Sequence, residues 1–251
     1  MKRGQVTLFI IMGMMIIILG ILLFLFSPKI QDIFSTETKN PSSFIQDCIE
    51  EDISLAVNVL SLNGGSINPE HYFVYDSSRL EYLCYIEGFY QTCVVQQPML
   101  KRHIEMEIEK AITQKSEECF IDLKESYERK GYQVSMSKGE IDVELLPQKI
   151  VTTFNNSLTL TKESTESYKS VRVIINNNLY ELVSIANSII DWESKYGDSE
   201  TTVYMNLYHD LKVEKKVHSE GTTVYVLTDR DNLNKFQFAS RSVAWPPGYA
   251  F

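Results

Sequence analysis

The stretch LCYIEGFYQTCV, residues 83–94, carries two of the four cysteines of this 251-residue chain. Aromatic and β-branched residues flank a single glycine, which is typical of a β-hairpin. A two-residue loop at Gly88-Phe89 would place Cys84 opposite Cys93 in a non-hydrogen-bonded pair, where Cα atoms lie about 4.5 Å apart. That separation suits a disulfide. The stretch therefore predicts a Cys84–Cys93 disulfide.

The other two cysteines, Cys48 and Cys119, lie on the apolar stripes of two predicted helices, one starting at Pro41 and one running from about Pro98 to Lys130. A bond between them would join the two helices. The alternative is a pair of buried free thiols, which behave as small hydrophobic side chains. An exported location favours the bond. The stripes comprise Phe44, Ile45, Ile49, Ile53 and Ala56 in the first helix and Ile104, Ile108, Ile112 and Leu123 in the second.

The second half of the chain changes to the alternation of β-strands. Apolar residues at every second position of 132–136 and 141–145, with Lys138-Gly139 between them, predict a hairpin with a type I′ turn. In that register Met136 faces Ile141. A helix is expected over Val171–Tyr196, with a buried stripe of Leu179, Leu182, Val183, Ala186, Ile189 and Ile190. Glu220-Gly221 is expected to form a hairpin turn between two strands. The further strands are expected at His71–Asp76, Lys149–Thr161, Thr202–Val217, Thr222–Thr228 and Lys235–Arg241.

An uncharged run of 21 residues, Val6 to Phe26, follows the basic residues Lys2 and Arg3 near the N-terminus. At about 1.5 Å per residue it spans roughly 30 Å, the thickness of a bilayer core. The run is longer than the apolar region of a secretory signal and lacks a small-residue cleavage site after it. It therefore predicts one membrane span, with the short N-terminus cytoplasmic and the C-terminal part extracellular.

The predicted fold class is α+β, with a single N-terminal transmembrane helix followed by a disulfide-containing ectodomain of an antiparallel sheet and several helices. We expect the leader junction and transmembrane helix at 1–28 and a stalk at 29–40. A helical part with the Cys84–Cys93 hairpin follows at 41–131, then an antiparallel sheet plus a helix at 132–244, and a proline and aromatic tail at 245–251.

No motif of an enzyme is found in the sequence. The four histidines are scattered without metal-ligand spacing, and Asn63-Gly64-Gly65-Ser66 follows a helix and so is interpreted as its cap and not as an anion-binding loop. We therefore assign no catalytic residue, no metal and no cofactor. The net charge of −9 argues against nucleic acid as a partner. Asn155 begins a glycosylation sequon, Asn155-Asn156-Ser157.

The junction Lys2-Arg3-Gly4-Gln5-Val6-Thr7, directly before the apolar run, resembles the leader of archaellins and other archaeal type IV pilin-like proteins. The resemblance implies that a prepilin peptidase cuts between Gly4 and Gln5, leaving the apolar segment to pack in a filament. Many type IV pilins carry Glu at the fifth mature position, where this chain has Phe9.

The whole chain is also similar to uncharacterised archaeal membrane-anchored proteins, through FIQDCIEEDISLAVNVLSLNGGSI (44–67), the region of Cys119 and FQFASRS (236–242). This second resemblance implies an archaeal setting and an architecture, and no activity. Three hypotheses follow. The first is a cell-surface structural or interaction protein that is pilin-like and self-associates. The second is a simple membrane anchor presenting a domain to an envelope protein or a glycan, and the third is an anchored enzyme.

Overall fold

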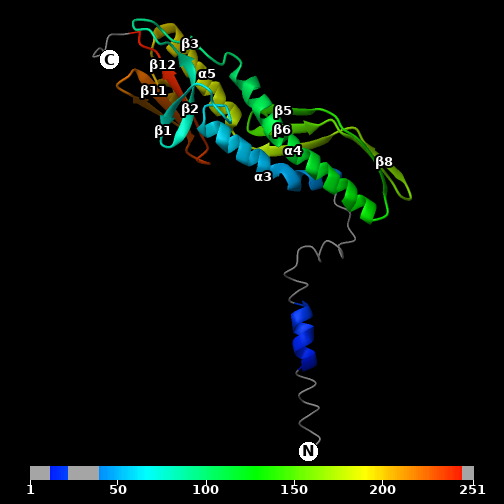
Figure 1. The fold of residues 1–251 in the computed structure, drawn as a ribbon. Coiled ribbons are helices and arrows are strands. Elements are labelled where there is room, and N and C mark those ends of the chain that lie inside the picture. Colours follow the sequence, from blue (N-terminus) through cyan, green and yellow to red (C-terminus); the bar gives the residue numbers. More distant parts are fainter. Residues whose placement is uncertain (1–11, 22–39, 245–251) are drawn as a thin grey trace, which may run out of the picture. The chain divides into compact units, whose positions relative to one another are not determined.

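The computed structural model describes residues 12–21 and 40–244, which belong to two compact units, 1–40 and 41–251 (Figure 1). In the first unit, residues 12–21 form a helix in which every residue is exposed. Most of these residues are large and apolar. Because exposed apolar area is unfavourable in water, this helix has a surface that is suited to burial against a partner.

The predicted transmembrane helix is corrected by the structure. No helix within residues 12–21 and 40–244 is both long enough and apolar enough to cross a membrane. The described part of the N-terminal helix, residues 12–21, has ten residues, which corresponds to about 15 Å, roughly half of a bilayer core. The remaining parts of the predicted span, 6–11 and 22–26, lie outside the described residues, as do most of the expected stalk and the tail.

The second unit begins with two long helices that pack against each other, α3 (Pro41–Leu62) and α4 (Leu100–Arg129). The disulfide Cys48–Cys119 joins the first half of α3 to the last half of α4, with a Cα–Cα distance of 5.9 Å. Gly65, just after α3, lies against Leu100 and Ile104 at the start of α4, so the two helices are antiparallel. The predicted stripes are buried: Ile45, Ile49 and Ile53 on α3, and Ile104, Ile108 and Ile112 on α4. This half of the disulfide prediction is confirmed.

The first group of strands is a three-stranded antiparallel meander in which each of the three strands is broken near its middle, so that it consists of two three-stranded sheets. One half pairs β4, β7 and β8, and the other pairs β5, β6 and β9. Each of the three rows is thus two consecutive strands with a short break between them. Both α3 and α4 pack on this meander. Its strands are β4 (Gln133–Ser137), β5 (Ile141–Leu146), β6 (Lys149–Phe154), β7 (Ser157–Thr161), β8 (Thr165–Tyr168) and β9 (Val171–Asn176).

The predicted hairpin at Lys138-Gly139 is wrong, because β4 and β5 do not pair with each other. The chain reverses instead at Pro147-Gln148, where Leu146 pairs with Lys149 and Gln148 has a φ of 63°. Gly139 lies at the break between β4 and β5. A Cβ atom there would lie 2.0 Å from the carbonyl oxygen of Asn155, so glycine is required by this close approach and not by a turn.

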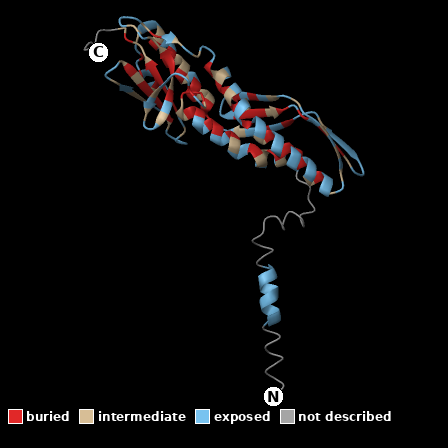
Figure 2. Cartoon of the chain, viewed as in Figure 1, coloured by how far each residue is buried: buried red, intermediate tan, exposed pale blue. Residues whose placement is uncertain are grey.

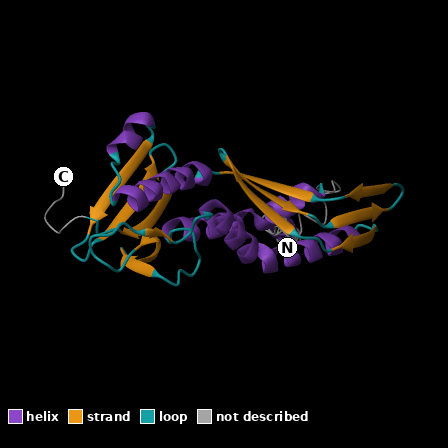
Figure 3. Cartoon of the chain, turned by 90° about the horizontal axis from the view of Figure 1, so that it is seen from above, coloured by secondary structure: helices purple, strands orange, loops and turns teal. Residues whose placement is uncertain are grey.

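The second group of strands forms a sheet in the order β1-β2-β12-β11-β10, with β3 also paired to β2. All of its pairs are antiparallel except β2 with β12, which is parallel. Figure 3 shows the two groups of strands at opposite ends of the unit. The strands are β1 (Tyr72–Tyr75), β2 (Ser78–Tyr85), β3 (Val94–Val95), β10 (Leu211–Val217), β11 (Thr222–Asp229) and β12 (Lys235–Arg241).

Helix α5 (Leu179–Tyr196) packs on the second sheet through the stripe that the sequence predicts, with Leu182, Ala186 and Ile189 buried. It begins later than expected, because the β-branched residues of 171–176 form strand β9 instead of the first turns of a helix. The expected strand at 202 begins only at Leu211, since Thr202–Leu207 is the short helix α6.

The larger of two hydrophobic clusters among the described residues connects the three long helices with both groups of strands, and a smaller one lies on the second sheet and comprises Leu80, Tyr82, Val224, Val226 and Ala239. The largest fully buried side chains of the larger cluster include Phe120 of α4, Phe154 of β6 and Tyr225 of β11. Figure 2 shows the buried residues along the inner sides of helices and strands and the exposed ones along their outer sides. Because its long helices pack on separate groups of mainly antiparallel strands, the second unit is of the α+β class, as the residue patterns predict.

Candidate functional site

The candidate site is the loop of residues 86–92, which the Cys84–Cys93 disulfide closes at its base. The Cα atoms of the two cysteines are 5.3 Å apart, so the predicted disulfide is present. The predicted register is wrong: Cys84 pairs with Val95 and Tyr85 with Val94, and the loop is longer than a two-residue turn. The two sides of the loop do not pair with each other as in the predicted hairpin; both form backbone hydrogen bonds with the end of β12 and the residues after it. The Ile86 amide donates to the Arg241 carbonyl at 3.0 Å, and the Gln91 amide donates to the Val243 carbonyl at 3.3 Å.

Arg241, the last residue of β12, holds the start of this loop in place through its side chain. Its guanidinium donates to the carbonyl oxygens of Ile86 and Glu87, the latter at 2.9 Å. The same group lies 5.9 Å from the centre of the Phe89 ring and 5.8 Å from that of Tyr85. A planar cation that binds backbone and stacks on rings restricts the loop at several points at once.

The tip of the loop carries two aromatic side chains in solvent. Phe89 is 59% exposed and Tyr90 is 68% exposed. Tyr90 also has a φ of 61°, a backbone conformation that residues with side chains adopt infrequently. The neighbouring rings of Tyr82 and Tyr85, by contrast, pack against each other and against His71, with centroid distances of 4.2–4.9 Å. Among these aromatic groups, Phe89 and Tyr90 are therefore the ones available to a partner.

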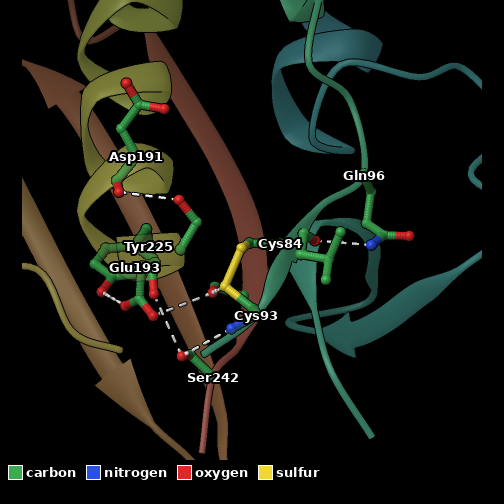
Figure 4. The surroundings of a disulfide bond; sticks show 10 residues. Cys84, Cys93, Gln96, Asp191, Glu193, Tyr225 and Ser242 are labelled. Carbon is green, nitrogen blue, oxygen red and sulfur yellow. Dashed lines mark hydrogen bonds between the residues drawn. A yellow bond between two sulfur atoms is a disulfide. The ribbon is translucent and has the colours of Figure 1, made fainter. Parts of the chain in front are cut away.

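A buried acid, Glu193 of α5, lies beside the disulfide (Figure 4). Tyr225 donates a hydrogen bond to one carboxyl oxygen, and Ser240 donates to the other at 3.4 Å. Burial raises the pKa of Glu193 to about 7, and the hydrogen bond from Tyr225 opposes that shift. Burial also raises the pKa of Tyr225, and the adjacent Glu193 adds to the effect. The Glu193 carboxyl beside the disulfide therefore changes its charge near neutral pH.

Two serines connect this acid to the loop. The Cys93 amide donates to Ser242 Oγ at 3.2 Å, and Ser242 Oγ donates to the Glu193 carbonyl at 3.4 Å. Ser240 Oγ lies 3.7 Å from Cys93 Sγ. Both sulfur atoms belong to buried residues, with Cys84 0% and Cys93 3% exposed. Buried sulfurs of this kind are typical of a structural disulfide and not of one that exchanges with other thiols.

A second polar cluster, Ser66, Glu81 and His103, was not predicted from the sequence. Ser66 Oγ donates to the Glu81 carboxylate and lies 2.7 Å from His103 Nε2. The acid holds the serine and not the histidine, and Ser66 is 6% exposed, so the arrangement differs from that of a serine hydrolase. It fixes the turn after α3, where Gly64 and Gly65 have φ of 81° and 105°. No local signal could reveal it, because the three residues are far apart in the sequence.

The remaining predicted residues are placed as follows. Asn155 is exposed at the break of the meander, next to the buried Asn156, whose side chain accepts a hydrogen bond from the Gly139 amide at 2.8 Å. Gly4 and Gln5 lie outside the described residues. Within 12–21 and 40–244, no group of three or more His, Cys, Asp or Glu side chains is arranged to hold a metal ion.

Comparison of the chain with family models, with curated proteins and with solved structures finds no match.

Proposed function

We propose that the chain is a cell-surface interaction protein whose second unit docks a protein partner through the loop of residues 86–92. The observation that carries the proposal is the exposure of Phe89 and Tyr90 on a loop that is already fixed at its base. Aromatic side chains dominate the binding energy of many protein interfaces. Such a pair is suited to an apolar pocket on a partner.

The fixed base of the loop supports this role. A partner that binds a mobile loop must oppose the entropy lost when the loop becomes ordered. Here the disulfide, the two hydrogen bonds from Arg241 and the Gln91–Val243 bridge order the loop before binding. The free energy of the aromatic contacts is then available for affinity.

The two disulfides support an extracytoplasmic location. All four cysteines are paired, as Cys48–Cys119 and Cys84–Cys93. Disulfides persist in oxidising compartments, whereas the cytosol of most cells keeps thiols reduced. The exposed Asn155 sequon is consistent with the same placement.

Site-specific photocrosslinking in native cells tests the docking loop. We expect a benzophenone side chain at position 90 to capture a discrete protein, and one at position 208, where the exposed Tyr208 of the α6 end provides a matched control, to capture none. Phe89→Ser in the same chain should weaken the capture about ten-fold, the effect of losing an interface hot spot. Equal capture at positions 90 and 208, or capture that is indifferent to Phe89→Ser, would overturn the proposal.

A second role, self-association, is favoured by the helix at 12–21, whose residues are all exposed and mostly apolar. Covering this surface between copies would lower the free energy by about 25 cal/mol for each Å² of apolar area. Together with the leader-type junction, this supports processing by a prepilin peptidase between Gly4 and Gln5, followed by packing of copies through the helix.

Intact mass and crosslinking test this second role separately. Co-expression with an archaeal prepilin peptidase should yield a chain that lacks residues 1–4, and crosslinking should then give multimers. Ile16→Glu should abolish the multimers, because it places a charge on the apolar surface, while leaving the processing unchanged. Retention of residues 1–4 contradicts the processing, and multimers that survive Ile16→Glu contradict the packing.

A further inference from the structure

A cleft of about 300 Å³ lies where α3, the start of α5 and the connection between β11 and β12 meet. Its volume is at the lower end of the range for sites that bind small molecules. The docking loop contributes no residue to it. The floor is aliphatic and includes Val57, Ile150, Ile175, Leu179 and Leu182.

One wall of the cleft is a polar face of α3 on which two side chains, Ser61 and Asn58, are available for hydrogen bonds. Ser61 lines the cleft and is 7% exposed, yet within residues 12–21 and 40–244 its hydroxyl has no hydrogen-bond partner. Asn58, one turn earlier, also lines the cleft, and its amide makes no hydrogen bond to any of the described residues. The Ser61 hydroxyl is not among the buried polar atoms that lack a partner, so it is open to the cleft and can both donate to and accept from a ligand group there.

The opposite wall is held in place by a network of amides. Asn178 is 3% exposed, accepts from Asn234 at 2.7 Å and donates to Asp229 at 2.5 Å. Asn177 accepts from the Leu179 amide at 2.8 Å through its Oδ1, which leaves its NH₂ group for a ligand. The Oδ1 of Asn234 is likewise available to accept. This wall thus presents both a donor and an acceptor in fixed positions.

The end of α3 is also fixed at the edge of the cleft. Gln237 of β12 donates to the Leu62 carbonyl at 2.8 Å, immediately after Ser61. Because both walls are anchored to the second sheet, the cleft is formed before any ligand binds. Preformed sites of this kind lose little conformational entropy on binding.

The lining chemistry points to an uncharged ligand with several hydroxyl groups. Only one of the lining residues, Lys235, is charged, and the carboxylate of Asp229 lies behind Asn178 on the same side. Amides and hydroxyls both donate and accept, as a set of neighbouring sugar hydroxyls requires. The aliphatic floor suits the C–H face of a sugar ring.

We propose that this cleft binds one neutral sugar unit, with Ser61 and Asn58 on one side of the ring and Asn177 and Asn234 on the other. The site is separate from the docking loop, so it adds a carbohydrate ligand to the proposed protein partner. In the proposed extracytoplasmic location, an envelope glycan would provide such a sugar unit.

Saturation-transfer difference NMR on the full chain tests the site with defined probes. The neutral probes are glucose, galactose, mannose and N-acetylglucosamine at millimolar concentration, and the charged probes are glucuronate and acetate. At least one neutral sugar should give a transfer signal. Ser61→Ala and Asn58→Ala should each weaken its affinity about five-fold, the effect of one lost hydrogen bond.

The control is Gln114→Ala, which removes an exposed amide from α4, outside the cleft. It should leave the affinity unchanged. Asn58 is an exposed helix residue, so its replacement keeps the fold and keeps the test interpretable even if Ser61→Ala lowers stability. Absence of signal from every neutral sugar, signal from glucuronate or acetate alone, or affinity that Asn58→Ala does not change would each overturn the assignment. None of these results bears on crosslinking at position 90.

Discussion

The Cys48–Cys119 disulfide joins residues that are 71 apart in the sequence, whereas Cys84–Cys93 joins residues that are nine apart. The first links two buried helix stripes, and the second closes a loop whose tip is exposed. In the loop-closure treatment of the unfolded chain, the first stabilises the fold by roughly 4 kcal/mol and the second by roughly 2.5 kcal/mol. The Cys48–Cys119 bond therefore chiefly stabilises the core, and the Cys84–Cys93 bond chiefly orders an exposed loop.

The largest expected effect comes from removing the helix-to-helix bond. Cys48→Ala with Cys119→Ala should lower the free energy of unfolding by about 4 kcal/mol, because the unfolded chain loses its longest constraint. Urea unfolding measures the change. Crosslinking at position 90 should persist under conditions where this variant is folded. A loss smaller than that caused by removing Cys84–Cys93 would reverse the comparison.

Glu193 should make the region around the shorter disulfide sensitive to pH. The folded state keeps the Glu193 proton up to a pKa of about 7, while the unfolded state loses it near 4.5. Its contribution is therefore fully present below pH 4.5 and is lost as the pH rises to about 7, a decrease of about 3 kcal/mol. The charge of Asp198 raises the pKa of Glu193 further, and the charge of Lys215 lowers it.

Unfolding measured from pH 4.5 to 7.5 checks this expectation. Glu193→Gln should remove most of the slope, since its amide does not titrate. The exposed Glu125→Gln on α4 serves as a control and should keep the slope of the unmodified chain. A Glu193→Gln variant with an unchanged slope would show that other groups cause the pH dependence.

Removal of the shorter disulfide should affect binding more than stability. Cys84→Ala with Cys93→Ala should cost roughly 2.5 kcal/mol of unfolding free energy. Capture of a partner at position 90 should fall as well, because the freed loop must be ordered on binding. If capture is unchanged while stability falls, the bond has no preparatory role and the contrast between the two disulfides disappears.

The smallest effect is expected at Arg241. Arg241→Lys should cost about 1 kcal/mol, because an ammonium group cannot reproduce the planar contact with two carbonyls and two rings. Hydrogen exchange at the Gln91 amide, which bonds to Val243 beside it, should become faster. Arg79→Lys, where the guanidinium lies 5.0 Å from the exposed Tyr72 ring, is the matched control and should leave that exchange rate unchanged.

Helical periodicity in the sequence predicted α3, α4, most of α5 and the Cys48–Cys119 bond, whereas the predicted membrane span is wrong and the Cys84–Cys93 bond is present in a register other than the predicted one. The stripe of α5 from Leu179 to Ile190 and the bond between Cys48 and Cys119 follow from side chains that share one face of a helix. Alternation in strands was less informative. It assigned Val143 and Leu145 to a buried face, which is correct, and paired them with the wrong strand, because a face can be buried against any neighbour.

The candidate sites depended on contacts that no local pattern contains. The docking loop follows β12 through Arg241, more than half a chain away, and this contact displaces the short turn expected at Gly88-Phe89. The cleft combines Ser61 with Asn177 and Asn234, each of which is an ordinary polar residue in its own segment. Single residues of this kind become recognisable only when the tertiary fold brings them together.

The parallel pairing of β2 with β12 has a consequence for the order of biosynthesis. The meander from β4 to β9 is built from neighbours in the sequence and can form early. The second sheet instead needs the register of Tyr82 with Ala239, so it stays incomplete until the residues of β12 have been synthesised. Maturation of the docking loop, which contacts the end of β12, therefore has to wait for a strand that lies about 150 residues later in the chain.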